Sequence, residues 1–276
     1  MSFRMSSLAA GTMNQLQQKM DMIAHNLANS NTVGYKERQT EFSDMLSQQI
    51  NNLTPADQAG PRRTPDGLRE GMGARLGAIN SNLEMGSIQV TERELDNVLR
   101  NEKHLFQVQA EHNGQQEVQY TRDGSFYLQP VGNGDDMMLV TQDGLPVLGQ
   151  NGAIQFSGAD VERIQMDEAG NLYVKRAGQV EDEIVGTLAL SEATFPRALE
   201  TVGDNLFRIG EEFANNNVMQ AVQNDDRVIQ NGAIEMSNVS MQDQMTDLIN
   251  AQRSYQMNAR SVTMSDQMQG LVNQLR

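Results

Sequence analysis

The sequence predicts an α+β fold in which helices at both ends of the chain enclose a central antiparallel β-domain. Apolar residues recur at helical spacing in residues 5–28 and 240–275. Short alternating runs separated by turn dipeptides fill the middle of the chain, and no helical interval separates them. Strands at this cadence form an antiparallel sheet or a small barrel and not a parallel α/β sheet.

The first expected helix carries one apolar face. Its apolar residues follow each other at intervals of four, three and four positions: Leu16, Met20, Ile23 and Leu27. The pattern ends at a run of Asn, Ser, Thr and Gly residues between positions 29 and 34. These residue types divert backbone hydrogen bonds into turns. We therefore expect a helix over residues 5–28 that is followed by a turn.

The second expected helix is longer and has a coiled-coil-like seam. Steps of four and three residues connect Met241, Met245, Leu248, Gln252, Tyr255, Ala259 and Val262, and the seam resumes, slightly rotated, at Met264, Met268 and Leu271. Residues 1–50 and 235–276 hold 12 of the 18 Met residues, and Met adapts to irregular interfaces. The two stripes can pair with other subunits, but periodicity alone also fits the core of an intramolecular hairpin.

The middle of the chain has the pattern of a β-domain. Alternation in residues 105–109 resumes at 118–120 after the hairpin dipeptide Asn113-Gly114. Residues 51–80 contain Pro and Gly punctuation that is typical of an irregular segment. We expect three parts: a helical assembly domain of residues 1–50 and 235–276, an irregular connector of residues 51–95, and a β-domain of residues 96–234.

Charge and composition exclude several functions. The formal net charge is -15, and residues 96–234 hold 22 acidic but only 9 basic side chains. Such a chain is not expected to bind the phosphate backbone of nucleic acids. The chain has no Cys, so it forms no disulfide or thiolate site. Its first residues lack the apolar core and the cleavage site of a secretory signal, so we expect no cleaved signal peptide.

Catalytic and metal-binding patterns are not recognisable. No two of the three His residues lie at the helical spacing of a ligand pair, and no Gly-rich segment has the strand and helix that a phosphate loop needs. The acidic clusters do not match the spacing of a calcium-binding loop, so we interpret them as solvated turns. We expect a non-enzymatic protein without cofactor, metal or small-molecule substrate.

Three short motifs span nearly the whole chain. The first comprises Asn26, Leu27, Ala28, Asn29, Asn31, Thr32, Gly34, Tyr35 and Lys36. The second is Tyr120-Thr121-Arg122-Asp123-Gly124-Ser125-Phe126 in the expected β-domain. The third is Ser237-Asn238-Val239 with the following run Ala251-Gln252-Arg253-Ser254-Tyr255 and Asn258-Ala259. All three closely resemble motifs of the flagellar rod and hook protein family, and they occur in that family's order.

The resemblance implies a structural subunit of the bacterial flagellar rod, similar to the distal rod. It implies export through the flagellar apparatus, location in the basal body, and assembly with itself and other axial rod and hook proteins. The terminal seams would then form the axial contacts. In the turn, Asn26, Asn29 and Asn31 would hold the backbone beside Tyr35, and Gly34 would supply a positive φ.

The chain departs from the family at Glu102-Lys103-His104, where family members commonly have two Gly residues, so we expect this turn to be built differently. Two other classes remain to be compared with the rod interpretation. A secreted β-domain with a helical stalk could act as a surface binding module, and exposed aromatic residues on one β face would favour it. An enzyme would require a deep pocket with converging carboxylates.

Overall fold

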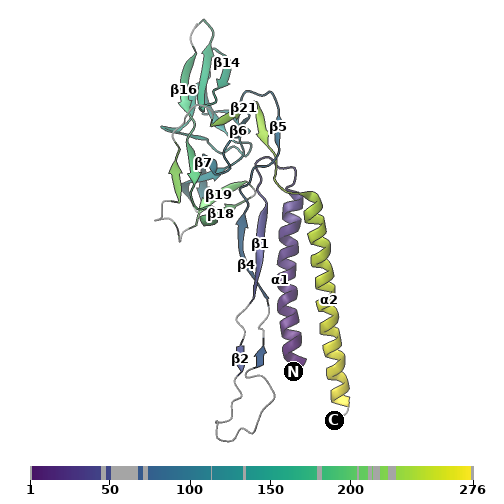
Figure 1. Ribbon diagram of the computed structural model, residues 1–276. Helices are drawn as coiled ribbons and strands as arrows, with labels where there is room; N and C mark the ends of the chain where they lie inside the picture. The colour runs from purple at the N-terminus through teal and green to yellow at the C-terminus, as the bar shows by residue number, and fades with distance from the viewer. Residues whose placement is uncertain are drawn as a thin grey trace. The chain divides into compact units, whose positions relative to one another are not determined.

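A computed structural model describes residues 2–44, 48–50, 68–70, 74–112, 114–132, 135–178, 182–203, 205–210, 213, 218–222 and 228–274. Two long helices, α1 (Ser2–Ala28) and α2 (Met241–Gln274), lie at the two ends of the chain (Figure 1). Both predicted helices are therefore confirmed, although residue 275 lies outside the described ranges. Neither of these helices combines the length and apolarity that crossing a membrane requires.

The chain divides into two compact units. The first comprises residues 1–25, 39–79 and 242–276, and the second comprises residues 26–38 and 80–241. The turn after α1 and the segment before α2 therefore belong to the same unit as the central strands. These boundaries differ from the expected ones, but the proposed assembly domain of residues 1–50 and 235–276 concerns contacts between subunits and stays a prediction.

The first unit contains short strand pairs besides the helices. Strand β1 (Arg38–Asp44) pairs with β4 (Ala74–Ser81), and β2 (Gln48–Ile50) pairs antiparallel with β3 (Leu68–Glu70). We expected an irregular connector over residues 51–95, and this expectation was wrong for the residues that form β4 and β5 (Ile88–Val90). Residues 51–67 and 71–73 lie outside the described part of the chain. The partner of β4 is more than thirty residues earlier in the sequence, so local Gly and Pro punctuation could not indicate this pairing.

The largest sheet lies in the second unit. It has six strands in the order β18 (Leu199–Val202), β19 (Leu206–Ile209), β8 (Gln115–Thr121), β7 (His104–His112), β17 (Leu190–Ala193) and β20 (Met219–Ala221). Every neighbouring pair in it is antiparallel. The predicted hairpin is β7–β8, in which Phe106 lies opposite Thr121.

Smaller antiparallel groups complete this unit. Three-stranded sheets are formed by β9 (Tyr127–Pro130), β10 (Asp136–Val140) and β13 (Gln155–Ser157), and by β14 (Val161–Met166), β15 (Asn171–Arg176) and β16 (Glu183–Thr187). Strand β11 (Leu148–Gly149) pairs with β12 (Gly152–Ala153), β21 (Ile229–Asn231) with β6 (Asn97–Leu99), and β22 (Ala233–Glu235) with β5. A short 3-10 helix covers Pro196–Ala198. The predicted α+β class with antiparallel strands is confirmed.

Alternating side chains form the core of this unit. In β15, Leu172 and Val174 are fully buried and belong to one hydrophobic cluster. Phe106 and Phe126 meet edge to face in the same cluster, with their ring centroids 5.1 Å apart. Such a pair adds to the stabilisation from area burial. The β-domain is therefore built on a packed apolar interior.

Candidate functional site

The predicted face of α1 is shielded from solvent. Leu16 and Ile23 are buried, and Met20 and Leu27 are half-buried. These residues therefore share one covered side of the helix, as their spacing predicted. Whether another subunit also contacts this side is a separate question, and the interface role of these residues stays a prediction.

The residues of the predicted α2 seam differ in their exposure. Leu248, Tyr255, Ala259 and Val262 are half-buried and lie on the side that carries the buried Gln244 and Ala251. Met241 and Met245 are exposed near the start of the helix, and Met264, Met268 and Leu271 are exposed on a different side. Apolar spacing identifies positions that avoid water but does not say whether the same chain covers them. The residues of the single seam expected from the sequence therefore do not share one environment.

The turn after α1 is held by one buried amide. The Asn26 side chain is fully buried, and its Oδ1 accepts hydrogen bonds from the Tyr35 hydroxyl at 2.9 Å and the Arg38 amide at 3.0 Å. Its Nδ2 donates to the Arg38 carbonyl at 2.9 Å. Asn29 closes the tighter part of the turn, because its Oδ1 accepts from the Thr32 hydroxyl at 3.1 Å.

Asn31, in contrast, is exposed to solvent. The turn-holding role that we expected from three Asn residues therefore rests on Asn26 and Asn29.

Gly34 brings the turn against the second family motif. Its φ is 69°, and a Cβ atom there would lie 2.5 Å from the Asp123 nitrogen and 2.8 Å from the Arg122 carbonyl carbon. Both the positive φ and this close approach require glycine. The adjacent Tyr35 is 1% exposed. The two motifs, which are separate in the sequence, thus lie in contact.

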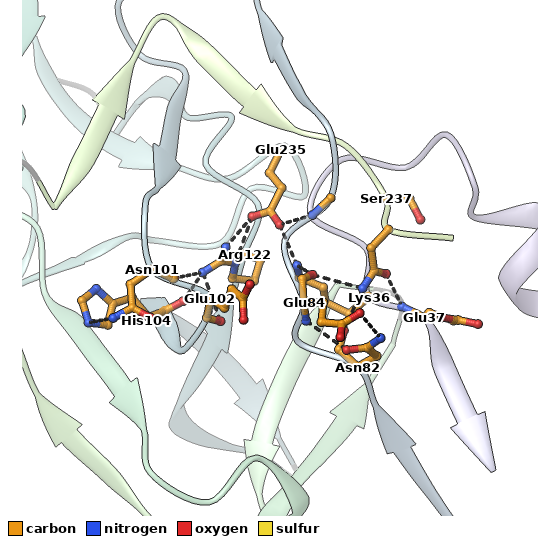
Figure 2. Close-up of polar contacts among 12 residues, drawn as sticks. Lys36, Glu37, Asn82, Glu84, Asn101, Glu102, His104, Arg122, Glu235 and Ser237 are labelled. Carbon is orange, nitrogen blue, oxygen red and sulfur yellow. Dashed lines mark hydrogen bonds and ion pairs between the residues drawn. The ribbon is translucent and has the colours of Figure 1, made fainter. Parts of the chain in front are cut away.

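A buried ion network joins the three motif regions (Figure 2). The Glu235 carboxylate accepts hydrogen bonds from Lys36 Nζ at 2.6 Å through Oε1, and from Arg122 Nη2 at 2.7 Å and Nε at 3.0 Å through Oε2. The Gly86 amide also donates to Oε1, at 2.9 Å. The three charged side chains are at most 1% exposed. We call this set, Lys36, Arg122 and Glu235, the ion junction.

Backbone carbonyls surround the surplus positive charge of the ion junction. Arg122 Nη1 donates to the carbonyl oxygens of Asn101 at 2.6 Å and His104 at 2.7 Å, and Lys36 Nζ donates to the Glu84 carbonyl. The segment at residues 101–104 thus curls around a guanidinium group, which is how this chain builds the turn where family members commonly carry glycines. Two buried cations share one carboxylate, and the dipoles of the backbone carbonyls stabilise the positive charge that the carboxylate does not neutralise.

The third motif binds the segments next to the ion junction through Asn238. Its Oδ1 accepts a hydrogen bond from the Glu37 amide at 2.7 Å, and its Nδ2 donates to the carbonyls of Asn82 at 3.0 Å and Glu84 at 3.1 Å. The Gly34 amide donates to the Glu235 carbonyl at 2.8 Å. Residues 235–238 therefore bind the turn after α1 through both backbone and side chains.

Burial sets the electrostatics of this region. Desolvation lowers the pKa of the Lys36 ammonium, and the adjacent Glu235 carboxylate opposes this effect. Burial likewise raises the pKa of the Asp123 carboxyl, although hydrogen bonds from the Ser125 hydroxyl and amide favour its charged form. Desolvation offsets much of the attraction in a buried ion pair, whereas loss of one partner leaves an uncompensated buried charge. The geometry is therefore suited to fixing one arrangement of the segments.

A cavity of about 530 Å³ lies elsewhere in the second unit. Its wall includes Glu92, Glu94, Asp167, Asp182 and Tyr173, and of these Glu92, Asp167 and Asp182 are exposed. In the described residues no group of three or more His, Asp or Glu side chains is arranged to hold a metal ion.

Sequence reasoning did not select the members of the ion junction as site residues. Lys36 and Arg122 stand inside the motifs, but only their neighbours were assigned a role. Glu235 precedes the third motif, where one acidic residue follows the alternating Ala233 and Ile234. The sequence therefore contained one signal of a buried polar site: Glu235 is charged, yet strand alternation predicts that its side chain is buried.

The fold and the ion junction define a class: an α+β protein whose distant segments are joined by buried structural contacts. Three family descriptions match this chain. "Flagella basal body rod protein" matches residues 8–36, "Flagellar hook protein FlgE/F/G D1 domain" matches residues 101–182, and "Flagellar basal body rod FlgEFG protein C-terminal" matches residues 230–275. Each matched range contributes one member of the ion junction: Lys36, Arg122 and Glu235 in turn.

Relatives match almost the entire chain. The flagellar hook-basal body complex protein FlhP of Bacillus subtilis is 38% identical over 271 residues, which cover 97% of each chain. The flagellar basal-body rod protein FlgG of Caulobacter vibrioides is 31% identical with the same coverage, and FlgG of Bacillus subtilis is 32% identical over 95% of each chain. The chain belongs to the flagellar basal-body rod and hook-basal-body family. It is a structural protein of this family and not an enzyme.

Proposed function

We propose that the chain is a distal-rod-like subunit that polymerises through its terminal helices and transmits torque between motor and hook. One observation carries this proposal: the C-terminal half of α2 has an exposed apolar stripe. Met257, Met264, Met268 and Leu271 are 65%, 61%, 66% and 60% exposed. Their spacing of seven, four and three residues places them on one side of the helix. We call these four residues the α2 stripe.

The α2 stripe is unfavourable in a free chain. Contiguous exposed apolar side chains on soluble proteins mark interaction surfaces or aggregation sites. Met side chains suit a contact that repeats with small variations, because the thioether chain adapts to irregular gaps. In a rod, a neighbouring axial subunit would cover this stripe, while the half-buried Leu248, Tyr255, Ala259 and Val262 serve the other side of the helix.

The names of the relatives support a location of this chain in the flagellar basal body. FlgG proteins are named for the basal-body rod, and they match 95–97% of this chain. We infer from them that the chain acts in the basal body, that its partners are itself and other rod and hook proteins, and that the flagellar export apparatus delivers it. The length and the single β-domain favour a distal-rod role over that of a hook subunit.

Deletion of residues 241–276 in the native cell tests the proposal. We expect electron microscopy to find basal bodies without completed rods and hooks, and motility to be lost. The full chain supplied from a plasmid is the control and should restore both. Normal rods and hooks in the deletion strain would contradict a role of α2 in assembly.

The stalked binding module has weaker support. Among the described residues, the exposed large aromatic side chains are Tyr127, Phe195 and Phe213, which come from three separate segments. The Arg93 guanidinium stacks over the Tyr127 ring, 4.1 Å from its centroid, so that ring already has a partner. A shared aromatic binding face is therefore not supported by these residues.

A further inference from the structure

The Glu235 carboxylate connects segments that are far apart in the sequence. Lys36 precedes it by 199 residues and Arg122 by 113 residues. Its two oxygens receive four N–H donors, which come from the turn after α1, from Gly86 before β5, and from Arg122 after β8. Figure 2 shows the carboxylate between the Lys36 and Arg122 side chains. One side chain therefore completes the coordination of three separate segments.

The two cations depend on Glu235 to different degrees. Arg122 keeps three backbone carbonyls, those of Asn101, Glu102 and His104, if the carboxylate is absent. Lys36 keeps the Glu84 carbonyl. A buried ammonium group with only a carbonyl partner is strongly unfavourable, because charge is costly in a low-dielectric interior. Loss of Glu235 should therefore destabilise the Lys36 segment more than the Arg122 segment.

The backbone adds to the same dependence. The Gly34 amide donates to the Glu235 carbonyl, and the Glu37 amide donates to Asn238 Oδ1. Residues 34–37 thus donate three hydrogen bonds to residues 235–238, and buried backbone amides need such acceptors. Until residues 235–238 arrive, the turn has its internal hydrogen bonds at Asn26 and Asn29 but lacks these three bonds to the C-terminal segment.

We propose that Glu235 is a positioning residue that makes the ordering of residues 26–38 conditional on the arrival of the C-terminal segment. A chain that emerges from its N-terminus presents Lys36 first and Glu235 almost last. The contacts that hold this turn to the rest of its unit are therefore complete only when nearly the whole chain is present. If the proposed assembly role holds, this order keeps an incomplete chain from fixing α1 for docking.

Hydrogen exchange on the full-length chain tests this inference, followed by mass spectrometry of peptides. In Glu235→Gln we expect amides of residues 26–38 to exchange faster by on the order of 100-fold, which is the equivalent of breaking a buried ion pair. Amides of β15 (Asn171–Arg176) should keep their protection. Glu200→Gln is the matched control, because Glu200 pairs with Arg208 at the surface of the same unit, and it should change neither peptide.

A double variant separates positioning from general weakening. Lys36→Met combined with Glu235→Gln removes the buried ammonium, so protection of residues 26–38 should recover in part. Unchanged protection of residues 26–38 in Glu235→Gln, or equal loss in residues 26–38 and β15, would overturn the inference. If Glu235→Gln is unfolded by circular dichroism, Asn238→Ala replaces it, and the same two peptides are compared. These outcomes do not involve assembly, so they are independent of the proposed function.

Discussion

The ion junction and the α2 stripe reverse the usual distribution of residue types. The junction places Lys36, Arg122 and Glu235 at no more than 1% exposure, whereas the stripe leaves Met257, Met264 and Met268 more than 60% exposed. Charged side chains are ordinarily outside and large apolar ones are ordinarily covered. Each exception needs its own explanation.

The difference between the two regions lies in where their partners are. Each charged group of the junction has an opposite charge and hydrogen-bond partners within the chain. The side chains of the α2 stripe are exposed, so none of the described residues covers them. We interpret the junction as a contact that the chain completes alone, and the stripe as one that needs a second subunit. The following predictions test each side of this comparison.

Arg122→Met should have the largest effect on stability. It removes a fully buried guanidinium that donates to the Glu235 carboxylate and to the carbonyls of Glu102 and His104, so we expect a loss of about 3–5 kcal/mol in the free energy of unfolding. Arg100→Met, at a pair in which Arg100 is 44% and Glu168 48% exposed, should cost at most about 1 kcal/mol. Urea denaturation measures both. Similar losses for the two variants would mean that the junction is no different from a surface pair.

Gly34→Ala should be the next most damaging change. A methyl group there would approach the backbone of Asp123 to 2.5 Å, and the φ of 69° is unfavourable for Ala, so we expect a loss of about 3 kcal/mol. Gly144→Ala shares the positive φ, at 80°, but a Cβ atom there would meet only Gln129 Oε1 at 3.8 Å, an ordinary contact, and it should cost about 1 kcal/mol. Thermal unfolding compares the two, and equal losses would show that the close approach has no energetic weight.

Tyr35→Phe should have a smaller effect of about 1 kcal/mol, because it removes one buried hydrogen bond to Asn26 and leaves the ring in place. Tyr127→Phe alters a ring that is 41% exposed and should be close to neutral. Chemical denaturation of both variants provides the measurement. An unchanged free energy of unfolding in Tyr35→Phe would show that the Tyr35 hydroxyl does not stabilise the turn.

His104 should give the smallest effect, visible as a dependence on pH. Burial lowers its pKa below the usual 6.5, so the unfolded chain binds a proton that the folded chain does not. Stability should therefore fall as the pH decreases through 6.5, with a slope below about 1.4 kcal/mol per pH unit. His104→Gln should have a shallower slope between about pH 7.5 and 5.5 in urea denaturation series. Identical slopes would contradict the assignment to His104.

Sequence patterns predicted those parts of the fold that depend on local periodicity. The helices over residues 5–28 and 240–275 and the hairpin at residues 105–120 appear as α1, α2 and β7–β8. Pairings between distant segments were not predictable: β4 follows Gly-rich punctuation and acquires its conformation from β1. Likewise, the Gly34 turn was recognisable, but Glu235 acquires its role from residues that precede it by 113 and 199 positions.

The differences in exposure along the predicted α2 seam were also not predictable from the sequence. Leu248 and Met268 both satisfy the apolar spacing, yet one is half-buried and the other is 66% exposed. Burial depends on the presence of a covering surface, and spacing along one helix contains no information about that surface.

Substitution of the α2 stripe tests the central claim most directly. The double variant Met264→Asp with Met268→Asp alters exposed positions, so the purified chain should keep its circular dichroism and thermal unfolding profile. In the native cell, electron microscopy should find rods and hooks missing, whereas Gln269→Asp, at an exposed position on a different side of the helix, should leave them complete. Complete rods with the double variant would show that the exposed stripe is not an assembly surface.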